Sequence, residues 1–305
     1  MRYRTRLLAF AAATVLLGGG PLVSARSMPA ALQPAADSAY SSAVKATPGL
    51  VGYWRVGETE GDRAADSSGQ GRDGTYAAAA QEGAQGLITG DPDLAVRLPG
   101  QPEGWIDAGD TLDFAGLAPF SVEFWIGPGP YTSASPYPRL VQKEGADLTS
   151  RRQGWLLYLS KETGRLGFER WRDGEADVVI SPDAIPIDTV THVVAVYNGE
   201  TMRLYVDGKA VSEGPSRREL LDTPFTFRVG ARSNGANPFS GIIDEVAVYD
   251  SALDDATVAG HFAAGAGAGK VVLPTSPAPV EPVQPTAPAA PTAAPAAPTA
   301  APAAP

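Results

Sequence analysis

Two turn dipeptides between Thr191 and Asp250 constrain the fold more than any other feature of this chain. Asn198-Gly199 and Asp207-Gly208 each separate two short apolar runs. Both central residues of a type I′ turn need positive φ, which Asn-Gly and Asp-Gly adopt readily, so each dipeptide predicts a tight β-hairpin. This part of the chain is therefore expected to form an antiparallel β ribbon.

The same pattern extends over residues 49–267, where short apolar runs alternate with clusters of Gly, Pro, Asp and Asn. It predicts one all-β domain, built as a two-sheet antiparallel sandwich of the jelly-roll type. One short C-terminal helix is expected near Leu253 to Ala263, with Asp254 as its N-cap. The other predicted strands are Leu50–Val56, Leu94–Leu98, Gly104–Asp107, Ser121–Ile126, Trp155–Ser160, Arg165–Arg170, Val178–Ser181, Val193–Tyr197, Phe225–Gly230 and Gly241–Tyr249.

Both flanks of this domain have a different composition. Residues 1–25 have three arginines, an apolar run and then small residues, which is typical of a secretory signal peptide. A retained membrane anchor is the alternative, although the apolar run is short for a span of about 20 residues. Residues 26–48 are rich in Ala, Ser and Pro and are expected to be a linker, and residues 268–305 a disordered Pro/Ala-rich spacer.

Charge and cysteine content limit the classes of partner. The whole chain has a net charge of −10, and removal of Arg2, Arg4 and Arg6 with the signal would bring it to −13. Such a surface repels nucleic acid phosphates and anionic lipid, and favours neutral partners, cationic partners or a divalent metal. Cysteine is absent, so an exported domain must be held by its core, alone or with a metal.

Four segments in order carry a resemblance to a known family. They are GLVGYWRVGE with ADSSGQGRDGTY (residues 49–58 and 65–76), FSVEFWIGP (120–128), HVVAVYNGETMRLYVDGKAV (192–211) and FSGIIDEVAVYDSALDDATV (239–258). The chain resembles laminin G-like domains of the concanavalin A-like lectin and glucanase superfamily. Thr191 stands where members usually carry Trp. The resemblance implies a jelly roll with a terminal strand and helix.

Catalysis is not expected. The laminarinase-type glucanases of that superfamily use an E-x-D-x-x-E strand, which places two carboxylates on one face. No such triplet is present, since the neighbours of Glu123 two positions away are Ser121 and Trp125. His192 and His261 are the only histidines, too few for a three-histidine metal site. His192 is expected to be a hydrogen-bonded strand residue.

A calcium site is one prediction for the polar loop Asp66 to Asp73, because calcium takes several carboxylate and carbonyl oxygens. Asp244 is the second clue, since period 2 places it in one row with Ile242, Val246 and Val248, and a buried carboxylate needs a partner. The resemblance to related jelly rolls implies Asp66 and Asp244 as metal ligands, with Glu58 and Asp73 as further candidates. The alternative is turn chemistry, in which Asp and Ser bond their own backbone.

Ligand binding is expected to use exposed aromatic residues, because sugar rings stack on indole and phenol faces. The candidates are Trp171, Trp155, Tyr131 and Tyr137. Trp171 lies at a predicted hairpin end, and the two tyrosines lie in a Pro/Ser-rich loop of the kind where binding residues concentrate. Packing in the core or as a loop anchor is the alternative for each.

These patterns together predict a secreted or surface-associated, non-catalytic module that recognises extracellular glycan or cell-envelope polysaccharide. Its partner would be a glycan or an envelope protein, with no nucleic acid and no membrane insertion after signal removal. Protein adhesion or surface display is the first alternative, and a glycosidase is the second.

Overall fold

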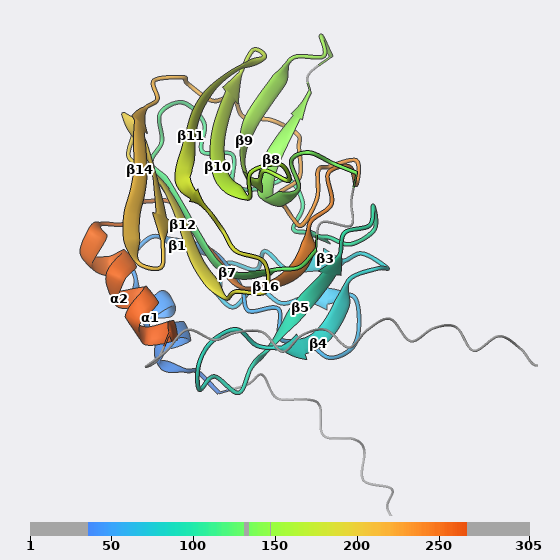
Figure 1. Cartoon of the computed structure of the whole chain (residues 1–305). Coiled ribbons are helices and arrows are strands. Elements are labelled where there is room, and N and C mark those ends of the chain that lie inside the picture. The colour runs from blue at the N-terminus through green and yellow to red at the C-terminus, as the bar shows by residue number, and fades with distance from the viewer. Residues whose placement is uncertain (1–35, 131–133, 147, 267–305) are drawn as a thin grey trace, which may run out of the picture. The chain divides into compact units, whose positions relative to one another are not determined.

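The computed structural model describes residues 36–130, 134–146 and 148–266, which form two antiparallel sheets and two helices (Figure 1). The expected all-β sandwich with a short C-terminal helix is confirmed. The signal segment 1–25, residues 26–35 and the tail 268–305 lie outside the described residues.

Sheet A has eight strands among the described residues, with the long strand β16 at its centre. The N-terminal half of β16 pairs with β5, its C-terminal half pairs with β1, and its other edge pairs with β7. The strands in spatial order are β14 (Lys209–Pro215), β13 (Thr201–Val206), β12 (Thr191–Tyr197), β7 (Phe120–Pro128), β16 (Ser240–Tyr249), β5 (Leu94–Pro99) and β4 (Gln81–Gln85), with β1 (Leu50–Trp54) beside β16.

Sheet B also has eight strands in the described part of the chain. Four of them, β8 to β11, form a meander that follows the chain order, and short strands from distant segments complete the sheet. The strands in spatial order are β11 (Glu175–Ala184), β10 (Arg165–Arg172), β9 (Arg152–Leu159), β8 (Arg139–Ala146), β15 (Arg228–Val229), β6 (Ile106–Asp107), β3 (Gly74–Tyr76) and β2 (Arg63–Ala64).

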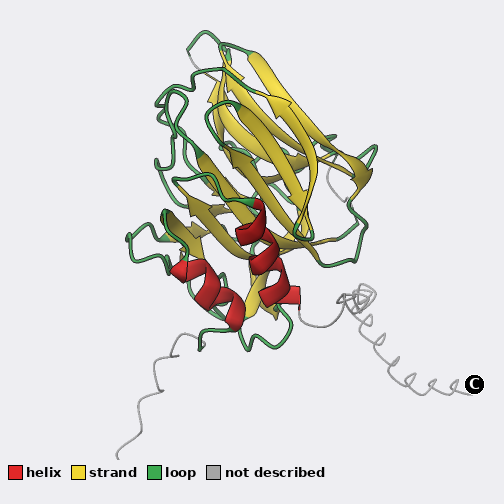
Figure 2. Cartoon of the chain, turned by 90° about the vertical axis from the view of Figure 1, so that its left-hand side faces the viewer, coloured by secondary structure: helices red, strands yellow, loops and turns green. Residues whose placement is uncertain are grey.

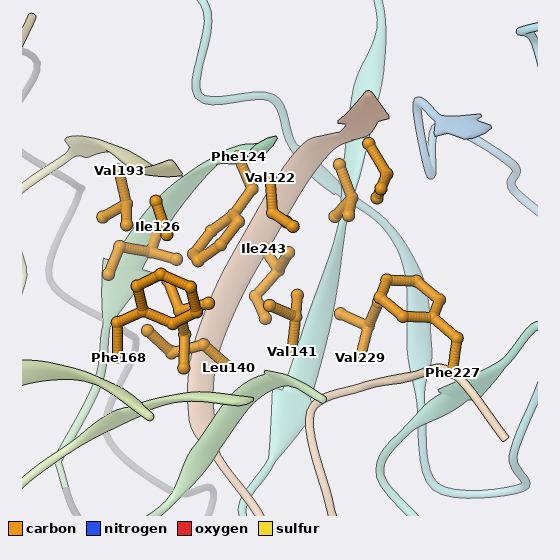
Figure 3. Packing of buried hydrophobic residues seen from close by; sticks show 14 of the residues in the cluster. Val122, Phe124, Ile126, Leu140, Val141, Phe168, Val193, Phe227, Val229 and Ile243 are labelled. Atoms are coloured by element: carbon orange, nitrogen blue, oxygen red, sulfur yellow. The ribbon is translucent and has the colours of Figure 1, made fainter. Parts of the chain in front are cut away.

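The main core lies between the facing surfaces of the two sheets (Figure 3). Period-2 alternation directs Val122, Phe124 and Ile126 of β7 into this core. Leu140 and Phe168 meet them from sheet B, and all five side chains are fully buried. The apolar alternation seen in the sequence therefore identifies the inner face of each sheet.

The two turn dipeptides behave differently. Asp207 (φ 49°) and Gly208 (φ 74°) both have positive φ, so the type I′ hairpin between β13 and β14 is confirmed. At Asn198-Gly199 only the glycine has positive φ. Asn198 instead accepts hydrogen bonds from the backbone of Glu200 and Thr201 through its side chain, which closes a longer loop.

Helix α1 (Ala39–Ala46) corrects the linker expected over residues 26–48. Ser38 caps this helix, and Tyr40 and Val44 are fully buried, so the end of that segment belongs to the folded domain. Helix α2 (Asp255–Ala266) is the expected C-terminal helix. Its N-cap is Asp254, whose carboxylate accepts a hydrogen bond from the Thr257 amide at 2.7 Å.

The two helices pack against each other and cover the outer face of sheet A (Figure 2). A hydrogen-bonded group of side chains joins them to β7 beneath. Glu123, fully buried, accepts a hydrogen bond from the Tyr40 hydroxyl of α1 at 2.8 Å and contacts His261 Nδ1 of α2 at 2.9 Å. On its other side His261 Nε2 lies 2.9 Å from the Thr47 hydroxyl, just after α1.

His192 lies in the same layer without a polar partner. Its ring is stacked on Phe262 and lies tilted against Trp125, and neither ring nitrogen has a hydrogen-bond partner among the described residues. This corrects the expectation of a hydrogen-bonded His192. Burial lowers the pKa of His192 to about 4, although the charge of Glu123 works in the opposite direction.

Replacing Tyr40 by Phe tests the attachment of α1. Glu123 would lose a hydrogen bond to a buried charge, so we expect the free energy of unfolding in urea to fall by about 1.5 to 3 kcal/mol. The exposed pair of Lys45 with Asp37 offers a control, since Lys45→Gln should cost well under about 1 kcal/mol. An unchanged stability for Tyr40→Phe would show that α1 is not docked in this way.

His192→Phe tests the acid sensitivity of the layer. Because the pKa of His192 is lower in the folded protein than in the unfolded chain, the unfolded chain takes up the proton first. The free energy of unfolding therefore falls as the pH falls from 6.5 towards 4. We expect the loss of stability between pH 7 and pH 4.5 to be smaller in His192→Phe by on the order of 2 to 3 kcal/mol, measured by urea unfolding.

His261→Gln is the matched control. Burial lowers the pKa of His261, but its hydrogen bond with Glu123 outweighs this effect and raises the pKa overall. A raised pKa stabilises the fold at acid pH and loses this contribution as the pH rises, so His261→Gln should be most destabilising at low pH. Equal pH profiles for wild type and His192→Phe would contradict the assignment.

Candidate functional site

Trp155 does not lie where a ligand could reach it. Its side chain is fully buried between the sheets, against Phe120 and Phe227, and its indole nitrogen donates a hydrogen bond to the carbonyl of Leu112. This corrects its assignment as a ligand-binding residue. In β9 it occupies an inward position of the alternating pattern, so its ring is part of the core.

The other aromatic candidates that the structure describes lie on the outer face of sheet B. Trp171 of β10 is half-buried, and the guanidinium of Arg152 lies 3.7 Å from the centre of its ring. Tyr137 is 48% exposed and packs edge-on against Tyr158 of β9. Tyr131 lies outside the described residues.

This outer face is built by the residues that alternate with the core residues in neighbouring strands. Glu169 of β10 lies opposite Val178 of β11, and Gly167 lies opposite Ile180. Val178 is 44% exposed and Ile180 is 46% exposed. Since both described helices lie against sheet A, neither covers this face.

A group of arginines that the sequence did not reveal lies on the same face. Glu144 of β8 is fully buried and lies within 3.2 Å of the guanidinium nitrogens of Arg139, Arg152 and Arg232. These arginines come from β8, β9 and the loop after β15. Only the pairing of β8 with β9 and β15 brings them together, so spacing along the chain gives no signal of the cluster.

A second tryptophan lies under an arginine farther along the sheet. The guanidinium of Arg228 of β15 lies 4.0 Å from the ring centre of Trp105, and it also pairs with Asp107 of β6 at 2.6 Å. In the strand register Arg228 lies opposite Gln142 and Asp107. This places it on the outer face.

Asp66 stabilises its turn through hydrogen bonds to backbone amides. Its carboxylate accepts hydrogen bonds from the backbone amides of Tyr53, Ser68 and Arg72, at 2.8 to 3.0 Å. Burial alone would raise the pKa of Asp66, but these hydrogen bonds outweigh it and lower the pKa. With both oxygens accepting from the backbone, this carboxylate is a poor metal ligand.

Glu58 and Asp73 also have partners. Glu58 accepts hydrogen bonds from the Ala65 amide and from the Tyr76 hydroxyl. Asp73 accepts one from the Asp66 amide and forms an ion pair with Arg63 at 2.7 Å. In the part of the chain that the structure describes, no three Asp, Glu, His or Cys side chains are arranged to hold a metal ion.

Asp244 has a different environment from the one expected. A β-bulge interrupts β16 after this residue, and Glu245 has a φ of 54°. Val246 and Val248 therefore face the core between the sheets, whereas Ile242 belongs to the helix-covered side. This corrects the single row expected for Asp244, Val246 and Val248.

Asp244 keeps one carboxylate oxygen without a partner. Oδ2 accepts a hydrogen bond from the Leu87 amide at 2.7 Å, while the buried Oδ1 has none among the described residues. Burial and the charge of neighbouring Glu245 raise the pKa of Asp244 well above its usual range. Beside it the guanidinium of Arg55 pairs with Glu245, Asp91 and Asp93.

One pocket of about 220 Å³ lies at the start of α2, beside the loop between β12 and β13. Its charged groups already have partners. Arg203 pairs with Glu213 and Asp255, and Asp254 caps the helix. Because the charged groups of this pocket are paired with one another or with the backbone, the outer face of sheet B is the stronger candidate site.

None of the helices in the described ranges is long and apolar enough to cross a membrane. None of the curated proteins matches this sequence, whereas solved structures of the same fold are numerous.

Three of these structures illustrate the match, and each covers 70% of this chain. The binding domain of Paraclostridial Mosquitocidal Protein 1 is 19% identical over 52% of its own length, with a TM-score of 0.55. Domain 4 of an extracellular arabinanase from Geobacillus stearothermophilus, in complex with arabinotriose, is 19% identical over 97% of its length, with a TM-score of 0.52. The botulinum neurotoxin type G receptor binding domain is 13% identical over 50% of its length, with a TM-score of 0.52.

At these identities the matches show a shared fold, and the chain spans about half the length of the toxin domains. The family evidence comes from the sequence itself. The Laminin_G_3 model, of the concanavalin A-like lectin/glucanases superfamily, matches residues 100–259. Because this match spans just over half of the 305 residues, the chain belongs to the Laminin_G_3 family of that superfamily.

Proposed function

We propose that this protein is an exported, non-catalytic binding module that recognises extracellular glycan or cell-envelope polysaccharide through the outer face of sheet B. One observation carries the proposal. This face has no helix over it among the described residues, and it presents Trp171 and Tyr137 beside charged side chains. Aromatic rings next to polar groups are the usual composition of a saccharide-binding surface.

The structural neighbours support a binding role. Two are binding domains of toxins, and one is an arabinanase domain solved with arabinotriose. The arabinanase domain is matched over almost its whole length, so a similar fold forms one complete domain of a larger extracellular enzyme. The proposed export rests on the signal-like residues 1–25.

The position of Glu123 supports a non-catalytic role. Glycoside hydrolysis uses two carboxyl groups flanking the bond to be cleaved. Glu123 is fully buried beneath α1 and α2, on the side of sheet A away from sheet B. It is therefore not available to a saccharide on the proposed binding face.

Protein adhesion is the second candidate, and one observation favours it. Val178 and Ile180 expose large apolar side chains on β11, at the edge of the proposed face. Apolar groups without aromatic character suit a protein partner better than a sugar ring.

Trp171→Ala tests glycan binding. The variant loses the ring proposed to stack on a sugar, so we expect the Kd for a glycan bound by the wild type to rise about tenfold or more in isothermal titration. Trp171→Phe keeps an aromatic ring and should retain most of the affinity.

Leu117→Ala is the control, because this exposed leucine lies outside the proposed face. A glycan array without any binding, together with capture of a purified envelope protein that depends on Val178, would replace the glycan proposal by the adhesion candidate.

Calcium is proposed as a structural ligand at Asp244, not at the loop of Asp66. Among the four metal candidates, Asp244 alone has a buried carboxylate oxygen recorded without a partner. Asp91, Asp93 and Glu245 already pair with Arg55, so Asp244 is the one carboxylate that would bind the ion, and the ion would offset the like charges of the other three. In Asp244→Asn the amide oxygen can still accept the hydrogen bond from the Leu87 amide, so this variant should fold normally.

We expect calcium at 100 times its Kd to stabilise the wild type by about 2.7 kcal/mol, which corresponds to a rise in Tm of about 5 to 10 °C. Asp244→Asn should abolish this rise. Asp66→Asn should lower the Tm without calcium, through its lost backbone hydrogen bonds, but leave the calcium response intact. An equal Tm of the wild type in calcium and in chelator would exclude the site.

A further inference from the structure

Three arginine–aromatic pairs lie on the outer face of sheet B. Arg152 lies 3.7 Å from the ring centre of Trp171, Arg139 lies 5.8 Å from that of Tyr158, and Arg228 lies 4.0 Å from that of Trp105. The paired residues lie in the adjacent strands β10, β9, β8 and β15, with Trp105 just before β6. Four strand spacings, about 19 Å, separate β10 from β6 across the sheet.

The arginine cluster on this face has a charge opposite in sign to that of the whole protein. Arg139, Arg152, Arg228 and Arg232 face three carboxylates, those of Glu144, Glu169 and Asp107. The balance is one positive charge, in a chain with a net charge of −10. Glu144, within reach of three of the guanidinium groups, is fully buried, whereas the side chains of Arg152 and Arg232 are each 26% exposed.

The charge near the binding surface matters more to a bound ligand than the net charge of the whole protein. At physiological ionic strength the Debye length is about 8 Å, so acidic residues elsewhere on the surface are screened from a ligand on this face. A guanidinium group binds a carboxylate through two parallel hydrogen bonds. An aromatic ring directly beside it can pack against the ring that carries that carboxylate.

We propose that the outer face of sheet B binds an acidic polysaccharide whose sugar rings carry carboxylate groups, a polyuronate. Arg139 and Tyr158 are buried, so the Arg152–Trp171 and Arg228–Trp105 pairs are the ones that place a charge beside a ring at the surface, and a uronic acid has this same arrangement within a single sugar unit. The distance across these strands suits a chain of several sugar units rather than a single sugar. This inference rests on the proposed glycan-binding function and names the chemical class of its ligand.

The test compares polygalacturonate with its fully methyl-esterified form, which keeps the rings and loses the charges. Isothermal titration of the full chain should show binding to the acid form and at least tenfold weaker binding to the ester. Affinity for the acid form should fall as salt is added.

Arg232→Gln is the first variant, since Glu144 keeps Arg139 and Arg152 as partners. Arg228→Gln is the second variant, and it removes the arginine that lies against Trp105. Each should weaken binding to the acid form at least about tenfold and leave the circular dichroism spectrum unchanged. Lys209→Gln, an exposed charge of β14 in sheet A, is the control and should bind like the wild type.

Equal affinity for the acid and the ester would overturn the inference and leave the glycan-binding proposal standing. Absence of binding to both forms, with a panel of neutral glycans bound in a Trp171-dependent manner, would have the same meaning. Absence of binding to every glycan tested would overturn both the polyuronate inference and the glycan-binding proposal. Equal competition by a single-stranded oligonucleotide would also overturn the inference, because charge alone would then account for binding.

Discussion

Burial of sheet A on both faces is the constraint on which the rest of the structure depends. Every residue of β7, β12 and β16 is buried, which requires sheet B on one side and the two helices on the other (Figures 1 and 2). Polar side chains on the helix-covered side must then find partners within a dry layer. Glu123 has two, one on each helix, so the contacts that compensate for burial of this carboxylate also fasten α1 and α2 to the sheet.

Because sheet A is enclosed, an extended ligand can meet the broad face of only one sheet. The two outer faces also treat carboxylates in opposite ways. Under the helices one arginine, Arg55, lies among Glu245, Asp91 and Asp93, and burial raises the pKa of Glu245 to about 7 despite that arginine. On sheet B three arginines surround Glu144, and one of them, Arg152, also lies 3.5 Å from Glu169. Carboxylates therefore outnumber arginines under the helices, whereas arginines outnumber carboxylates in the cluster on the outer face of sheet B.

Much of the fold could be predicted from the sequence, because period-2 alternation and turn residues act over short distances. Asp207-Gly208, the strand of Val193–Tyr197 and the cap at Asp254 follow such local rules. The failures are equally physical. Strand β8 was not predicted, because the charged residues Lys143 and Glu144 interrupt its apolar pattern; folding buries both of them in ion pairs. Asp244 was assigned to the wrong row because a bulge, with Glu245 at positive φ, shifts the alternation by one residue.

The candidate site was only partly predictable for a related reason. Trp171 follows from its place at a hairpin end, but its companions Arg232, Arg228 and Trp105 reach it through the order β9, β8, β15 and β6, which is not the order of the chain. Net charge was also misleading, because it sums over a surface of which a ligand contacts one part. Ion pairs with Glu144, Glu169 and Asp107 leave one positive charge in excess on this cluster of arginines. The rings of Trp171 and Trp105 also stabilise Arg152 and Arg228 as cations without neutralising them, so a locally basic cluster can persist on an acidic protein.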